Sequence, residues 1–160
     1  MKRIVIAVAI GAVAVIGIVA YSQVKGDKTE AKALKGTTLT GKSFDLATMR
    51  GKPAVVNFFA SWCPPCNAEA PDLVAFSKAH PEVDFVGVAV NDERTDTEGF
   101  VSKYGLAYTV VYDPEGGSGS DWGVTGIPTT FFLDARGVVR DTIVGAASRE
   151  QFEASLAKAL

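Results

Sequence analysis

Hydrophobic and polar positions follow one another in blocks along this chain, and the spacing changes from block to block. Residues 54–60 are almost continuously apolar, as in a strand that is covered on both faces of a sheet, and residues 83–90 form a second such block. Between the two, residues 65–79 place Ala70, Leu73 and Phe76 on one face at helical spacing. The pattern therefore predicts a buried strand, a helix and a second buried strand.

The flanking blocks predict the rest of the fold. Residues 37–39 and 43–46 read as a hairpin that turns at Thr40-Gly41-Lys42, and the glycine-rich residues 116–120 read as a short flexible loop. The remaining predicted elements are a helix over 93–103, a strand over 108–112, a hairpin of 129–133 with 138–144, and a closing helix over 149–160 capped by Ser148. This order predicts an α/β sandwich with a mixed sheet.

The N-terminal block differs from all the others in its length. Lys2 and Arg3 precede an uninterrupted apolar run over residues 4–21, eighteen residues long. As a helix, that run would span roughly 27 Å, close to the roughly 30 Å of a bilayer's hydrocarbon core. We predict that residues 1–21 are a single transmembrane anchor and that the basic flank keeps the N-terminus in the cytoplasm while the rest is exported.

A cleaved signal peptide is the alternative for the same segment, with Ala20-Tyr21-Ser22 as the cleavage site and a secreted product. Residues 22–35 are polar and lysine-rich, and we expect a linker there. Residues 36–160 remain as one folded domain. Both interpretations place that domain outside the cytoplasm.

Composition and charge narrow the function classes. Of the 160 residues, 48% are apolar, which is enough for one well-packed domain. The net charge is −2, and it becomes more negative once Lys2 and Arg3 are set aside. Since no basic patch is evident, the sequence argues against nucleic-acid binding.

The only two cysteines lie in one short run, Trp62-Cys63-Pro64-Pro65-Cys66, at the junction of the predicted strand and helix. A helix N-terminus favours the thiolate, which is the nucleophile in disulfide exchange. We expect an exposed Cys63 at the N-cap to attack and a more buried Cys66, one turn later, to resolve. Pro64 and Pro65 remove two backbone donors, so we expect only a moderate lowering of the Cys63 pKa.

Two other uses of this cysteine pair fit the sequence less well. A structural zinc site needs four ligands, whereas the chain offers two cysteines and one histidine, His80, which we expect to be a surface cap at a helix end. A structural disulfide across four residues would constrain the unfolded chain very little. The pair therefore predicts redox chemistry without a metal or a cofactor.

Three segments resemble one protein family. Residues 55–66 (Val-Val-Asn-Phe-Phe-Ala-Ser-Trp-Cys-Pro-Pro-Cys), residues 126–134 (Gly-Ile-Pro-Thr-Thr-Phe-Phe-Leu-Asp) and residues 41–46 are similar to motifs of the thioredoxin superfamily. Within it, residues 37–160 most resemble the membrane-anchored, extracytoplasmic thiol–disulfide oxidoreductases of the TlpA, ResA and DsbE type. The resemblance implies a thioredoxin-like fold, with a central mixed sheet flanked by helices and an N-terminal hairpin.

The resemblance also implies roles for individual residues. Pro128 falls at the family's cis-proline, and the backbone of Ile127 before it would pair with an extended substrate. Glu69 matches an acidic residue near the cysteines and takes the proton-handling role, because Asn57 replaces a buried aspartate of cytoplasmic thioredoxin. The alternative for Glu69 is a solvated glutamate in the first helical turn. We expect Trp62 to pack beside the site, or else simply to fill the core.

The expected function is thiol–disulfide exchange with protein substrates through a mixed disulfide. By resemblance, the protein is a monomeric reductant in cytochrome c maturation or a related pathway, acting on substrates such as apocytochrome c and recharged by a membrane electron-transfer protein. A disulfide-forming oxidant is one alternative. A copper(I)-binding chaperone that uses both thiolates and His80 is the other.

Overall fold

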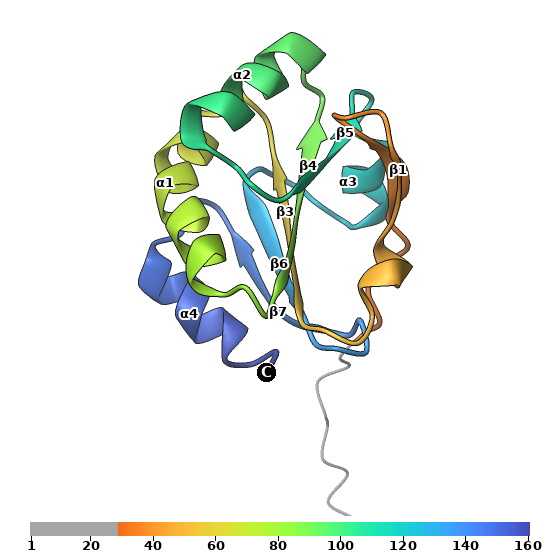
Figure 1. The fold of residues 1–160 in the computed structure, drawn as a ribbon, viewed down its shortest axis with the longest axis vertical. Helices are drawn as coiled ribbons and strands as arrows, with labels where there is room; N and C mark the ends of the chain where they lie inside the picture. Colours follow the sequence, from red (N-terminus) through yellow and green to blue (C-terminus); the bar gives the residue numbers. More distant parts are fainter. Residues whose placement is uncertain (1–28) are drawn as a thin grey trace, which may run out of the picture.

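The computed structural model describes residues 29–160, which form a seven-stranded mixed sheet with helices on both faces (Figure 1). The strand order is β2-β1-β5-β4-β3-β6-β7. The elements are β1 (Lys35–Thr38), β2 (Ser43–Asp45), the 3₁₀ helix η1 (Leu46–Met49), β3 (Ala54–Phe59), α1 (Pro64–Ala79), β4 (Asp84–Val90), α2 (Arg94–Tyr104), β5 (Thr109–Asp113), α3 (Gly117–Asp121), β6 (Thr129–Leu133), β7 (Val139–Val144) and α4 (Arg149–Leu156).

The centre of the sheet is parallel and its two margins are antiparallel. Strand β3 pairs in parallel with β4, and β4 pairs in parallel with β5. Strands β6 and β7 continue the sheet beside β3 as an antiparallel hairpin, and the β1–β2 hairpin closes the other side by pairing with β5. All six residues of β3 are buried, as the continuous apolar pattern predicts.

Alternate residues of β3 supply the two halves of the core. Val55 and Phe59 face the side covered by α1, α2 and α4, where they pack with Phe76, Phe100 and Phe152. The other face is covered by the N-terminal hairpin, η1 and α3, and its core is built from Leu34, Phe44, Leu46, Val56, Phe58 and Trp122. This two-sided core holds the C-terminal end of β3 rigidly, and the cysteine run begins there.

Most predicted elements are confirmed within two residues, including the N-terminal hairpin, the mixed sheet and the α1 stripe of Ala70, Leu73 and Phe76. The predicted loop over residues 116–120 is wrong, because residues 117–121 form the short helix α3. Trp122 follows this helix, is 8% exposed, and packs its ring against Phe58 and Phe131. Tertiary packing thus overrides the weak helix propensity of a glycine- and serine-rich segment.

The predicted anchor, residues 1–21, and the first part of the predicted linker lie outside the described residues. The described part of that linker differs from the prediction because it packs on the domain. The Ala31 N–H donates to the Gly137 carbonyl at 2.8 Å, and Leu34 is only 1% exposed. None of the helices found between residues 29 and 160 is both long and apolar enough to cross a membrane.

Candidate active site

The two cysteines close a disulfide at the start of α1. Cys63 is the N-cap, and its Cα lies 5.3 Å from that of Cys66. Pro64 and Pro65 carry no N–H, so the first amide of the helix that can reach the Cys63 sulfur belongs to Cys66. That N–H points at Cys63 Sγ from 3.2 Å. In the reduced protein, the same donor would stabilise a thiolate on Cys63.

Both cysteines are buried, each with 2% of its surface exposed. The expectation of an exposed Cys63 is therefore wrong for this disulfide-bonded state. The segment before β6, which contains Ile127, covers the sulfur. Cys63 Sγ lies 3.6 Å from the carbonyl oxygen of Ile127. The Ile127–Pro128 peptide bond is cis, as the family resemblance implies.

A buried carboxylate that the sequence analysis missed fixes the loop before Cys63. Asp92, 5% exposed, accepts the Ser61 N–H and the Ser61 hydroxyl, each at 2.7 Å, and the Thr97 hydroxyl at 2.9 Å. These bonds tie the β3–α1 loop to the connection between β4 and α2. The one sequence signal is a polar residue placed directly after a buried strand, which does not reveal its partners.

Asn67 holds the same loop from the other side. Its side-chain amide donates to the carbonyl oxygens of Ser61 at 2.8 Å and Cys63 at 3.0 Å. Its Oδ1 accepts the Tyr104 hydroxyl at 2.8 Å, which connects the start of α1 to the end of α2. The backbone that carries Cys63 is therefore held by side chains from two neighbouring segments.

Trp62 lies beside the disulfide at the surface, and the alternative of simple core filling is wrong. Trp62 is 60% exposed, and its indole N–H donates to the Asn91 carbonyl at 2.8 Å. A groove of about 210 Å³ runs from Trp62 past Asn91, Gly116 and Gly126 to Ile127. The exposed ring and the groove meet next to the segment that covers Cys63.

Glu69 is buried one turn beyond Cys66, so the alternative of a solvated glutamate is wrong. It is 3% exposed, and its two oxygens accept the Asn57 side-chain amide at 3.0 Å and the Ala147 N–H at 3.2 Å. Asn57 also donates to the Thr130 hydroxyl at 2.9 Å. Asn57 thus occupies the core position that the resemblance assigned to it and contacts Glu69 directly.

Burial dominates the protonation of Glu69. Loss of solvation raises the pKa of the Glu69 carboxyl to about 7, although the hydrogen bonds from Asn57 and Ala147 act in the opposite direction. The pKa of the Tyr108 hydroxyl is also raised, first by burial and then by the nearby charge of Glu69. A group with a pKa near neutrality can both accept and release a proton at physiological pH.

A small cavity lies between this carboxyl and Cys66. Its volume is about 10 Å³, and Cys66, Glu69, Asn57 and Tyr108 are among the residues that line it. This is close to the smallest space that holds one water molecule.

His80 lies far from the cysteines, at the C-terminal end of α1. It is separated from Cys66 by fourteen residues of helix, or about 21 Å. Its ring nitrogens lie 2.9 Å from Glu82 Oε1 and 2.9 Å from Glu153 Oε2. Burial lowers the pKa of the His80 imidazole, but the bonds to the two carboxylates outweigh it and the pKa is raised. The copper site of the alternative interpretation is therefore not assembled around His80.

Comparison with known proteins places this site in a family. The Redoxin family model matches residues 23–160. The soluble secreted antigen MPT53 of Mycobacterium tuberculosis is 44% identical over 101 residues, which cover 63% of this chain and 58% of that protein. The thiol-disulfide oxidoreductase ResA of Bacillus anthracis is 33% identical over 124 residues, which cover 76% of this chain and 72% of ResA.

A solved structure has a similar fold as well as a similar sequence. It is that of a secreted Mycobacterium tuberculosis disulfide oxidoreductase homologous to E. coli DsbE, with a TM-score of 0.72 and 37% identity. The match covers 78% of this chain and 94% of that one. By contrast, the chain spans little more than half the length of the MPT53 proteins that it matches.

Proposed function

This chain belongs to the Redoxin family, and we propose that it is a thiol–disulfide oxidoreductase that exchanges disulfides with proteins through Cys63 and Cys66. One observation carries the proposal. The Cys63–Cys66 disulfide lies at the N-terminus of α1, with the Cys66 N–H 3.2 Å from Cys63 Sγ and the Ile127 carbonyl 3.6 Å from it. A nucleophilic sulfur, a donor that stabilises its anion and a backbone that can bind a peptide thus converge at one point.

The exchange runs in two steps when the protein acts as a reductant. The Cys63 thiolate attacks one sulfur of a substrate disulfide, a mixed disulfide forms, and the other substrate sulfur leaves as a thiolate that takes a proton from water. Cys66 then gives its proton to Glu69 and attacks Cys63 Sγ. The mixed disulfide breaks and the second substrate sulfur leaves. The substrate gains two electrons, and Cys63 and Cys66 lose the same two.

Glu69 sets the protonation of the resolving cysteine. A carboxyl with a pKa of about 7 is roughly half ionised at neutral pH, so it can take the Cys66 proton when the mixed disulfide is present. When ionised, its charge also disfavours a second negative charge on the reduced cysteines and limits premature thiolate formation. Both effects act through the cavity between Cys66 and Glu69.

The substrate is an extended protein segment that lies between Trp62 and Ile127. The groove of about 210 Å³ beside Trp62 accommodates side chains that flank the reacting cysteine, and Ile127, which precedes the cis-proline Pro128, lines the groove and contacts the Cys63 sulfur. We assign the reaction to reduction in cytochrome c maturation or a related pathway, following the resemblance to ResA and DsbE proteins. The electrons come from a membrane electron-transfer protein. The reduction potential of the pair, measured against glutathione, separates a reductant from a disulfide-forming oxidant.

The site of action is outside the cytoplasm. We propose that residues 1–21 hold the domain at the cell membrane as a single-pass anchor, because Lys2 and Arg3 precede an apolar run long enough to span a bilayer. Secretion after cleavage is the alternative. It agrees with the soluble secreted character stated for the mycobacterial relative.

Trapping of the mixed disulfide tests the proposed roles. Cys66→Ala leaves no internal thiol to clear the intermediate, so covalent adducts should accumulate and appear on non-reducing gels of cell extracts. Cys63→Ala is the matched control and should form few adducts or none. Mass spectrometry of the trapped adducts identifies the substrate. Equal trapping by both variants, or trapping by Cys63→Ala alone, contradicts the assignment.

A further inference from the structure

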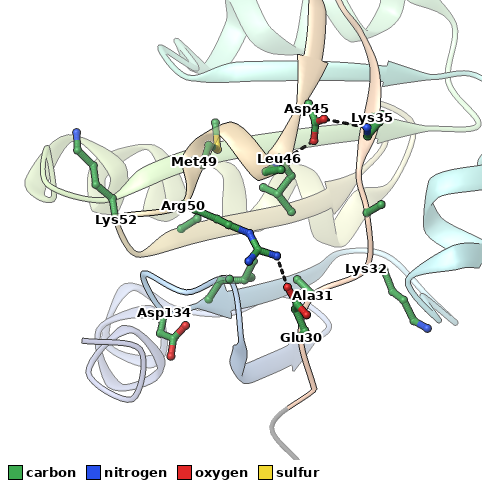
Figure 2. A pocket seen from close by; sticks show the side chains of 15 residues that line it. Glu30, Ala31, Lys32, Lys35, Asp45, Leu46, Met49, Arg50, Lys52 and Asp134 are labelled. Carbon is green, nitrogen blue, oxygen red and sulfur yellow. Dashed lines mark hydrogen bonds and ion pairs between the residues drawn. The ribbon is translucent and has the colours of Figure 1, made fainter.

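The end of the domain opposite the cysteines carries a second cavity. It has a volume of about 310 Å³ and lies between the N-terminal segment over residues 30–35 and residues 45–54, with Asp134 and Gly137 beside them. Its floor is apolar and includes the buried side chains of Leu46 and Leu133. Its rim is charged, and Figure 2 shows Arg50 reaching from one wall toward Glu30 on the other.

Lysine and arginine side chains are more concentrated around this cavity than on the rest of the domain. Residues 29–160 contain twelve lysines and arginines, and six of them lie on the rim or on the adjoining β6–β7 hairpin. These are Lys32, Lys35, Arg50, Lys52, Arg136 and Arg140. Four carboxylates share this region: Glu30, Asp45, Asp134 and Asp141. The other thirteen carboxylates of residues 29–160 lie elsewhere with only six cations, so a positive rim stands out on an acidic domain.

Cationic side chains of the rim can bind an anion from outside the protein. The Arg50–Glu30 ion pair spans the cavity mouth with side chains that are 55% and 60% exposed, and pairs this exposed contribute little to stability. A phosphate can replace the Glu30 carboxylate, since a guanidinium binds both groups with two parallel hydrogen bonds. Lys32 and Lys52 are exposed and have no carboxylate partner in the part of the chain that the structure describes.

We propose that this cationic rim docks on the phosphate head groups of an anionic bilayer. The inference rests on the anchoring proposed above, because the described chain begins at Thr29, directly at the rim. Only residues 22–28 separate Thr29 from the apolar run, and seven residues reach at most about 25 Å. An anchor at residues 1–21 therefore keeps the rim close to the membrane surface, where its charge is complementary to anionic lipids.

Docking would fix the orientation of the redox site. Strand β3 begins at Ala54 beside the cavity and ends at Phe59, just before the cysteine run. Its six residues span about 20 Å, so the disulfide would face away from the bilayer at about that height or more.

Hydrogen–deuterium exchange of the full chain in lipid vesicles tests this docking. Amides of residues 30–36 and 46–53 should exchange several-fold more slowly in vesicles of equal parts phosphatidylglycerol and phosphatidylcholine than in pure phosphatidylcholine. The protection should disappear at about 1 M salt, where the screening length falls to about 3 Å. Lys32→Gln combined with Lys52→Gln should abolish most of the protection, because each cation in contact with the lipid contributes roughly fivefold to binding. The matched control, Lys42→Gln with Lys78→Gln, changes two exposed lysines away from the rim and should keep it.

Three results would overturn the proposal. These are equal exchange in the two kinds of vesicle, equal losses in the rim and control variants, and protection by inorganic phosphate alone with neutral vesicles, which would assign the rim to a free anion. A carbonate wash of the same vesicles reports separately on the anchor. Release of the chain by that wash contradicts the anchoring without touching the disulfide chemistry, which the trapping experiment decides.

Discussion

Replacing Glu69 by glutamine should make the protein more stable at alkaline pH and slightly less stable at acidic pH. The wild-type carboxyl has a pKa of about 7 in the folded state, against 4.5 for an ordinary glutamate. Because the folded pKa is the higher one, the unfolded chain releases the proton first as the pH rises. The stabilisation from a neutral Glu69 is complete below pH 4.5 and is lost as the pH rises through 7.

The size of this effect follows from the shift. Each unit of pKa difference corresponds to 1.36 kcal/mol, so burying the ionised Glu69 costs about 3 kcal/mol above pH 7. A glutamine side chain does not titrate and therefore avoids that cost. It can still accept the Asn57 amide, but it loses the bond from the Ala147 N–H, which removes about 1 kcal/mol at every pH.

Urea unfolding of the oxidised protein measures the prediction without interference from that lost bond. The difference in unfolding free energy between Glu69→Gln and wild type should shift by about 3 kcal/mol in favour of the variant between pH 4 and pH 8. Asp72→Asn, an exposed acid on the same helix, should show no such shift. A difference that stays flat with pH would refute the reasoning, because Glu69 would then be ionised at no cost.

Three further outcomes are expected. In the reduced protein, Glu69→Gln should lower the Cys63 pKa measured by alkylation rate against pH, because one negative charge near the thiols is removed; an unchanged titration would remove Glu69 from thiol tuning. His80→Gln should destabilise the protein below pH 6.5, with a deficit that shrinks as the pH rises through the raised folded pKa, as followed by thermal unfolding; a pH-independent deficit would contradict the double carboxylate contact. Phe152→Ala should reduce the unfolding free energy by about 3–5 kcal/mol, since this fully buried ring stacks between α1 and the sheet; a loss below 1 kcal/mol would show that the site collapses.

The sequence predicts the main strands and helices of this fold well, because they depend on the local pattern of apolar residues. The continuous apolar runs become β3 and β4, and the helical spacing of Ala70, Leu73 and Phe76 becomes the buried face of α1. The two cysteines could be placed at a helix start because a strand pattern ends just before them. In each case, the information lies within a few residues.

What the sequence does not predict depends on distant partners. From the residues alone, a solvated Glu69 stays open as an alternative until the fold brings the Ala147 N–H, far along the chain, to its carboxylate. Asp92 likewise gains its role only when Ser61 is folded against it. The segment before Lys35 contains one large apolar residue, Leu34, and that single side chain reaches the core.

The way the N-terminal segment joins the sheet determines how the domain would respond to mechanical load. Residues 29–31 bond to residues 137–139 near the cavity, and β1 lies between β2 and β5. A pull on the chain at Thr29 would first peel the short pairing with the β6–β7 hairpin, one bond at a time. The pull would next act on β1, along the axis of that strand. There the hydrogen bonds to β2 and to β5 would resist the force together, in shear. The disulfide lies outside this load path, so a pull at Thr29 would leave the geometry of the cysteines undisturbed until β1 itself gives way.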